Sequence, residues 1–254
     1  MTLSVYRVWR DAAKPGKKMR VLVTRPLEDG EETARQLAEN GHTALLAPLL
    51  ATQFHPGGPI SLEGVQAILA TSANGVRALV RRTERRDLPL FAVGPQTAEE
   101  ASAAGFADVR NADGDARTLA RATQGWARPE DGALLHVRGS EGASILAEAI
   151  RRDGFTLREE VLYSVLPRPL QPDAIQALKS GLVDAALFFS PRSAGIFRDT
   201  ALKEALPTRS LLALCISAAT AAALMPLTFG ETRIATAPNQ SALLACLDRT
   251  GQQP

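Results

Sequence analysis

An internal repeat constrains the fold of this chain more than any other feature of its sequence. Residues 183–195, VDAALFFSPRSAG, place a short apolar run before Ser190 and Pro191, and residues 65–75, VQAILATSANG, repeat that order. Each run is too short for a helix and is typical of a buried strand in a parallel sheet. The hydroxyl residue is then expected to cap the following helix, with Pro191 at its first position.

The repeat extends along the chain. RVLVTRP at residues 20–26 is echoed by ALLHVRG at residues 133–139. Three matched pairs are separated by 113, 118 and 123 positions: Arg25 with Arg138, Ser72 with Ser190, and Thr97 with Thr220. The separations rise in order, as loops of different length would produce in two copies of one fold. The sequence therefore predicts two domains of the same architecture.

Strand-like and helix-like segments alternate along both copies, which predicts an α/β fold with doubly wound parallel sheets. The expected strands are residues 20–24, 43–50, 67–70, 89–93, 108–111, 133–137, 157–167, 185–189, 211–216 and 233–236. The expected helices are residues 27–40, 74–86, 98–104, 119–124, 143–153, 173–179, 193–202, 218–225 and 241–248.

Two extended segments that contain proline, residues 43–50 and 157–167, are expected to pair as an antiparallel ribbon. The intervening QFHPGGP, residues 53–59, has the composition of a linker. The predicted domain boundaries are 19–50 with 168–254 for domain 1, 53–162 for domain 2, and linkers at about 47–56 and 158–168. Residues 1–18 are expected to form a loose N-terminal tail, with Met19 as the candidate true start.

Composition narrows the possible partners. The 254 residues include 29 basic and 27 acidic side chains, a formal charge of +2, so we expect no nucleic-acid or membrane-surface partner. No segment reads as a membrane span or a secretory signal. Cys215 and Cys246 lie in apolar segments without metal-ligand spacing, which indicates buried thiols in a reducing cytoplasm.

Familiar catalytic motifs are missing from the sequence. There is no Walker loop, GxGxxG, HExxH or GxSxG. The three histidines, His42, His55 and His136, fall in a turn, a linker and a strand interior, and each is interpreted as a residue without a special role. We therefore expect no metal site.

Hydrogen-bonding side chains gather where predicted strands run into helices, at the edge of an open sheet where ligands bind. The candidate substrate-binding residues at these junctions are Thr71, Ser72, Asn74, Thr97, Ser190, Ser193, Ser217 and Thr220. Helix capping alone would also account for each of them. Arg25 and Arg138 are not needed as caps and would suit an acidic ligand. Tyr163, in the proposed ribbon, is either a packing residue or a phenolic proton donor.

Several short motifs in this order resemble the uroporphyrinogen-III synthase family. They are VLVTRP, TSANGV, AVGPQTA, HVRG, VLYSVLP, FFSPRSA, SAAT and PNQSALL, spread from Met19 to the end of the chain. The resemblance implies two flavodoxin-like domains joined by a two-stranded antiparallel ribbon. One departure is LCISAATA, where Ile216 and Ser217 replace a common glycine-proline pair.

The resemblance also implies a cofactor-free, cytoplasmic, monomeric lyase of tetrapyrrole biosynthesis. Its substrate, hydroxymethylbilane, is a linear tetrapyrrole with eight carboxylates, which the enzyme closes with ring D inverted through a spiro intermediate. Tyr163 would assist loss of the substrate hydroxyl, and Thr97 and Thr220 match threonines that face the substrate. Arg25, Ser72, Asn74, Arg138, Ser190 and Ser193 would bind carboxylates or shape loops.

Two other functions fit the same pattern. A nucleotide- or sugar-phosphate-using α/β transferase would also combine two doubly wound domains, but it needs a glycine loop that holds phosphate, and the sequence has no clear one. A non-catalytic module that binds a small anion would show affinity without turnover. Product analysis separates these alternatives from a synthase.

Overall fold

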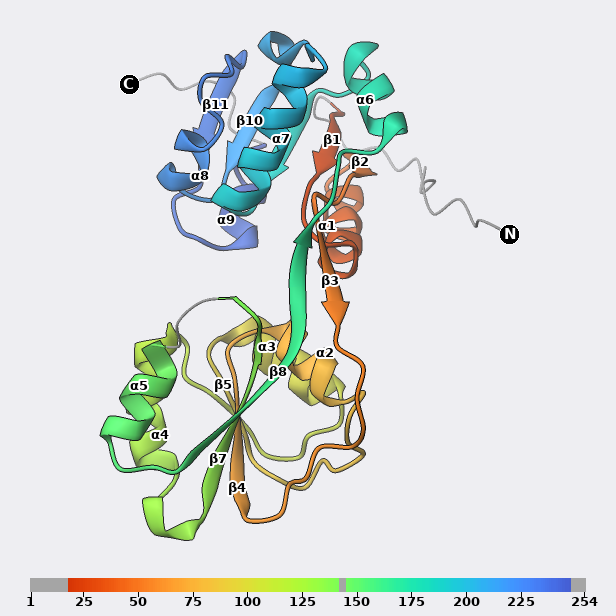
Figure 1. Ribbon diagram of the computed structural model, residues 1–254. Helices are drawn as coiled ribbons and strands as arrows, with labels where there is room; N and C mark the ends of the chain where they lie inside the picture. The colour runs from red at the N-terminus through yellow and green to blue at the C-terminus, as the bar shows by residue number, and fades with distance from the viewer. Residues whose placement is uncertain (1–17, 142–144, 248–254) are drawn as a thin grey trace. The chain divides into compact units, whose positions relative to one another are not determined.

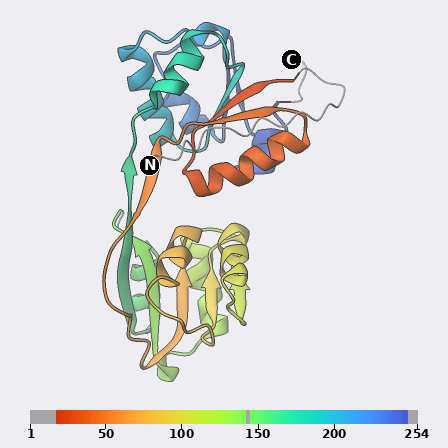
Figure 2. The ribbon, with the colours of Figure 1, turned by 90° about the vertical axis from the view of Figure 1, so that its right-hand side faces the viewer.

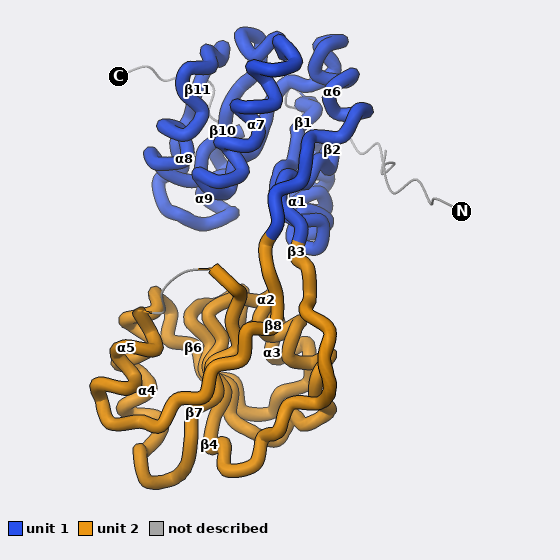
Figure 3. Tube along the Cα trace, in the orientation of Figure 1, with its two compact units in different colours: residues 1–51, 166–254 blue, residues 52–165 orange. Residues whose placement is uncertain are grey.

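The computed structural model describes residues 18–141 and 145–247 (Figure 1). The chain divides into two compact units (Figure 3). The first takes the chain up to Ala51 and again from Leu166, and the second is Thr52–Val165. The expectations about the N-terminal tail concern residues outside the described ranges, apart from Lys18.

The first unit contains a five-stranded parallel sheet in the order β11-β10-β9-β1-β2. Its strands are β1 (Arg20–Val23), β2 (Thr43–Leu46), β9 (Ala185–Phe188), β10 (Leu212–Cys215) and β11 (Glu231–Ile234). Its helices are α1 (Leu27–Glu39), α6 (Pro172–Lys179), α7 (Pro191–Lys203), α8 (Ala218–Ala222) and α9 (Gln240–Leu244), with a 3-10 turn at Thr208–Ser210. Counted along the unit, the strand order is 2-1-3-4-5, the flavodoxin-like arrangement.

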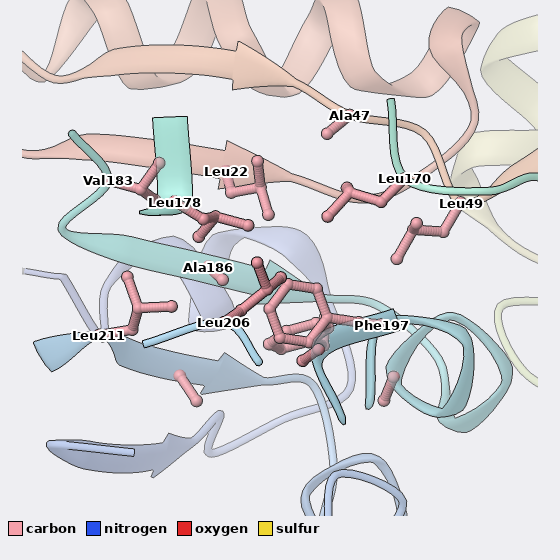
Figure 4. Packing of buried hydrophobic residues seen from close by; sticks show 14 of the residues in the cluster. Leu22, Ala47, Leu49, Leu170, Leu178, Val183, Ala186, Phe197, Leu206 and Leu211 are labelled. Carbon is pink, nitrogen blue, oxygen red and sulfur yellow. The ribbon is translucent and has the colours of Figure 1, made fainter. Parts of the chain in front are cut away.

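Apolar side chains cover both faces of this sheet. On one face, α6, α7 and α8 pack against the sheet, and Leu22, Phe188 and Phe197 are fully buried there (Figure 4). On the other face, α1 and α9 contribute Leu37 and Leu243. Cys215 and Cys246 are both buried free thiols, as the sequence predicts, and burial raises the pKa of Cys215 to about 12.

The second unit contains a six-stranded sheet in the order β3-β8-β7-β4-β5-β6. The strands are β3 (Leu50–Phe54), β4 (Val65–Ala70), β5 (Leu90–Ala92), β6 (Val109–Asn111), β7 (Ala133–Gly139) and β8 (Leu157–Pro167). The helices are α2 (Ala73–Leu79), α3 (Pro95–Ala103), α4 (Ala116–Trp126) and α5 (Ile145–Arg152), with a 3-10 turn at Pro129–Asp131. Helices α2 and α3 cover one face of the sheet, and α4 and α5 cover the other (Figures 1 and 2).

The strand order of the second sheet differs from the flavodoxin-like expectation. Strands β4 to β8 are all parallel and lie in the order 3-2-1-4-5 when numbered along the unit. This is the other common doubly wound order. It arises because β7 returns beside β4 on the side away from β5, and β8 then adds next to β7.

The segment at residues 43–50 is not the single strand that the sequence predicts. Pro48 has no N–H to donate, and the last bonds to β1 run from Ala47 N to Val23 O, 2.9 Å, and from Leu49 N to Thr24 O, 3.1 Å. The chain then starts β3, which takes in the Gln53 and Phe54 assigned to the linker. The strand beside β8 is therefore β3, not residues 43–50.

Two flanking backbone bonds give the direction of the β3 and β8 pair. His55 N donates to Leu162 O, and Arg168 N donates to Leu49 O, each at 2.8 Å. Because one residue number rises as the other falls, the two strands run antiparallel.

Helix α2 is much shorter than the predicted 74–86. After Leu79 the backbone leaves the helix, and the carbonyl of Arg82 accepts a bond from Ile60 N at 2.9 Å. The Arg82 guanidinium donates to Gly58 O at 2.6 Å. The residues after Leu79 therefore form hydrogen bonds to the loop at residues 58–60 and do not continue the helix.

Helix starts follow the predicted capping chemistry. Ser72 accepts from Gly75 N, Ser190 from Ser193 N, and Ser217 from Thr220 N. Pro191 occupies the first position of α7, as predicted. At these three junctions a serine hydroxyl caps the next helix, whereas α1 and α3 start at Pro26 and Gly94 without a side-chain cap.

Candidate active site

A cavity of about 310 Å³ lies at the carboxyl end of the second unit's sheet. Strands β4 and β7 are neighbours there, but the helices that follow them, α2 and α5, pack on opposite faces. Open α/β sheets bind ligands at such a switch point, outside the strand ends. The lining residues come from the ends of β4, β7 and β8 and from α4 and α5: Thr71, Ala116, His136, Arg138, Gly139, Ser140, Glu141, Ile145, Leu146, Tyr163 and Val165.

Tyr163 projects from β8 into the wall of this cavity and is 8% exposed. Its hydroxyl lies 2.7 Å from Ser72 Oγ, which also accepts from Gly75 N at 3.1 Å. A shift in strand register sets Gly139 opposite Tyr163. A Cβ at Gly139 would lie 2.9 Å from Tyr163 Cε2, so any larger residue at this position would clash with the Tyr163 ring.

Arg138 also lines the cavity and belongs to an ionic cluster. Its Nε is 3.0 Å from Glu159 Oε1, and Arg151 reaches the other oxygen of that carboxylate at 2.7 Å. Desolvation opposes ionisation of Glu159, but the hydrogen bond from Arg151 and the two positive charges outweigh it and hold the pKa below its usual range. Two arginines thus face one carboxylate.

His136 completes the cluster and is 2% exposed. Its Nδ1 is 3.7 Å from Glu159 Oε1, too far for a hydrogen bond, and neither ring nitrogen has a hydrogen-bond partner among the described residues. Burial lowers the pKa of His136 to about 4, against the opposing pull of Glu159. The imidazole is therefore neutral at pH 7.

A chain of hydrogen bonds supports the cavity rim. Ser140 Oγ donates to Ser164 Oγ at 2.9 Å, and Ser164 Oγ is 2.7 Å from His55 Nε2. His55 Nδ1 is 3.1 Å from the Val161 carbonyl, which can only accept, so Nδ1 carries the proton. Nε2 then accepts from Ser164, and Ser140 is left with an oxygen lone pair for a ligand.

The cavity lining includes three of the residues singled out from the sequence, Thr71, Arg138 and Tyr163, and Ser72 is linked to it through its hydrogen bond to Tyr163. Two others of the second unit lie outside its lining. Asn74 accepts from Arg77, which pairs with Glu100 at 2.7 Å, and Thr97 is 4% exposed near the start of α3.

The five remaining candidates belong to the first unit. Ser190 and Ser193 bond to each other around the start of α7, as Ser217 and Thr220 do around α8. Arg25 forms an ion pair with Asp29 at 3.3 Å, and its guanidinium lies 4.4 Å from the centroid of the Phe189 ring. It also donates to Gln240.

The cluster of His136, Glu159 and Arg151 was missed by sequence reasoning. His136 and Arg138 are two positions apart in HVRG, which places them on one face of the strand. That spacing was the available signal. Glu159 could not be found in this way, because its place beside His136 depends on the register between β7 and β8.

Within residues 18–141 and 145–247, no three His, Cys, Asp or Glu side chains come together in a way that could hold a metal ion. No helix in those ranges has the length and apolar character needed to cross a membrane.

The fold and the cavity define a class of protein, a doubly wound α/β protein with an arginine-bearing site at its strand ends. Comparison with known families is more specific. A family model described as uroporphyrinogen-III synthase HemD matches residues 31–245. The match takes in most of the chain, and the chain belongs to this family.

A solved structure of a similar protein shares the α/β fold. Uroporphyrinogen-III synthetase from Helicobacter pylori aligns with a TM-score of 0.60 at 18% identity, covering 91% of this chain and 98% of that one. A mutant uroporphyrinogen III synthase from the extremely thermophilic bacterium Thermus thermophilus aligns with a TM-score of 0.49 at 22% identity, covering 90% and 97%. The Helicobacter pylori structure supports the α/β fold with parallel sheets. A comparison with curated proteins found no match.

Proposed function

We propose that this chain is a uroporphyrinogen-III synthase, a lyase that removes water from hydroxymethylbilane and closes the tetrapyrrole with ring D inverted. The observation that carries the proposal is the pairing of a phenol and a guanidinium, Tyr163 and Arg138, in one cavity at a switch point. A substrate with eight carboxylates and one leaving hydroxyl needs these two kinds of group. Membership of the family supports the same activity.

Tyr163 is the proton donor to the leaving hydroxyl. Gly75 N–H donates to Ser72 Oγ, and Ser72 can in turn donate to the Tyr163 oxygen across 2.7 Å. This order leaves the Tyr163 proton free for the substrate. As that proton moves to the hydroxyl, the C–O bond breaks and water departs, which leaves the azafulvene in its N-protonated form. Ser72 then stabilises the phenolate oxygen until it is protonated again. The proton that the substrate loses from this cation, before or after ring closure, returns to the Tyr163 oxygen.

The other task of the enzyme is to control the geometry of ring closure. Spontaneous closure gives the uninverted isomer, so the protein must hold ring D with its substituted carbon next to the reactive methylene, where attack gives the spiro intermediate. The volume of the cavity, about 310 Å³, is at the small end for ligand sites, so it receives one end of the linear tetrapyrrole. Arg138 binds a carboxylate of that end, with Thr71 beside it.

The other candidates support the substrate less directly. We assign the junction residues Asn74, Thr97, Ser190, Ser193, Ser217 and Thr220 to shaping loops whose backbone N–H groups bind carboxylates. Arg25 has internal partners in Asp29 and Gln240, so its contribution is to hold the end of β1 in shape. The two units correspond in this account to two doubly wound domains joined through β3 and β8.

Product analysis tests the function. The purified protein is supplied with freshly generated hydroxymethylbilane, and the uroporphyrinogen isomers are separated after oxidation. A synthase gives the inverted isomer III faster than the spontaneous reaction gives isomer I. A product mixture equal to that of a protein-free control would contradict the proposal, and tight binding with that same mixture would favour the binding module.

A further inference from the structure

Among the described residues of the cavity wall, neutral His136 is a buried polar side chain that neither proton donation by Tyr163 nor carboxylate binding by Arg138 explains. It is 2% exposed, yet neither ring nitrogen has a hydrogen-bond partner among the described residues. Leaving a buried polar group unpaired destabilises a fold, because the group has lost its bonds to water. A buried imidazole without a hydrogen-bond partner at the wall of a cavity indicates that a bound ligand supplies the missing partner.

The charges around the imidazole indicate the chemistry of that partner. Glu159 faces it from β8, Arg138 shares its strand, and Arg151 reaches the same carboxylate from α5. With Glu159 ionised and His136 neutral, the cluster has one more positive than negative charge. Glu141, an acidic residue of the lining, is exposed. An anionic group would therefore be attracted to the inner wall.

We propose that His136 is a substrate-positioning residue that donates an imidazole N–H to one carboxylate of the tetrapyrrole, beside Arg138. Arg138 supplies the charge, and His136 supplies direction from a buried and rigid strand. Glu159 orients the Arg138 guanidinium through an ion pair of 3.0 Å. Because its carboxylate also offsets part of the positive charge, the subsite does not bind every anion strongly. The inference rests on the proposed function for the identity of the ligand, but its test does not require turnover.

The chain has only three histidines, so their ring signals can be followed separately by NMR of protein labelled in the histidine ring. The probes are a pyrrole bearing a propionate side chain and its methyl ester, which keeps the pyrrole N–H and loses the charge. We expect the acid to move the His136 signal and to raise its pKa by about one unit or more, because a nearby anion favours the protonated ring. The ester should produce neither change, and Arg138→Ala should weaken the response to the acid.

Two results would overturn the inference. One is a His136 signal that the acid leaves unchanged while other signals of the cavity wall move. The other is an equal response to acid and ester, which would make the pyrrole N–H the partner. Because the readout is binding, the inference can fail in a protein that still makes isomer III, and it can hold in one that does not.

Kinetics with hydroxymethylbilane provide a second test. We expect His136→Leu to raise KM by roughly tenfold, the value of about one hydrogen bond to a charged group, with a smaller effect on kcat. His136→Asn, which keeps a side-chain N–H donor, should recover part of that loss. If both variants fold and share the wild-type KM, the imidazole does not position substrate. If neither variant folds, the NMR experiment on the wild-type protein decides the question.

Discussion

Gly139→Ala moves the Tyr163 ring without removing any group from the site. The added Cβ would lie 2.9 Å from Tyr163 Cε2 and 3.0 Å from Cζ. Carbon atoms in contact prefer about 3.5–4.0 Å, so the ring must retreat by roughly 0.5–1 Å. Gly139 does not have a positive φ, so alanine is compatible with its backbone. The clash with the ring is therefore the main consequence.

The expected losses follow from that displacement. The hydrogen bond of 2.7 Å between Tyr163 and Ser72 is weakened, because the same shift along it would lengthen it to about 3.2–3.7 Å. A misplacement of about 1 Å can cost on the order of 100-fold in rate, and overpacking costs about 1–3 kcal/mol of stability. We therefore expect the rate of isomer III formation to fall by roughly 10- to 100-fold while the fold survives.

The assay is the rate of isomer III formation, with thermal unfolding measured on the same samples. Gly125→Ala is the matched control, because its Cβ would meet nothing within 4 Å and it lies in α4 away from the cavity lining. It should keep the wild-type rate. A folded Gly139→Ala protein with the wild-type rate would refute the placement of Tyr163.

Two further predictions follow from the charges. Arg138→Ala should raise KM by about tenfold or more. Arg25→Ala should mainly lower the unfolding temperature, because the Arg25 guanidinium is already paired with Asp29. Equal effects of the two substitutions on KM would contradict this. His136 has a pKa of about 4 in the fold against 6.5 when unperturbed, so the unfolded chain binds its proton first as pH falls. Stability should therefore decline by roughly 2–3 kcal/mol from pH 6.5 to 4, and by less in His136→Asn; superimposable urea-unfolding profiles would contradict it.

Local chemistry explains why much of the fold was predictable. Short apolar runs, hydroxyl caps and Pro191 each act within a few residues, and Ser190 caps α7 as expected. The failures are non-local. Pro48 ends one strand, but nothing near it indicates that β3 joins the other sheet, and the 3-2-1-4-5 order depends on where β7 returns.

The same distinction between local and non-local information applies to the site. Tyr163 and Arg138 could be singled out from short motifs, and the cavity contains both. His136 was passed over because a lone histidine in a strand usually packs without a special role. Its relation to Glu159 depends on the pairing of β7 with β8, and its lack of a hydrogen-bond partner depends on the packing around it. Neither follows from composition or spacing.

The most direct test of the account is the isomer produced by Tyr163→Phe, compared with the wild type on the same hydroxymethylbilane. The change removes one oxygen and its bond to Ser72, for a stability cost of about 1 kcal/mol. We predict a folded protein whose rate of isomer III formation falls by at least 100-fold, so that spontaneous isomer I dominates. Isomer III formed at the wild-type rate would contradict the central role given to Tyr163 and its cavity.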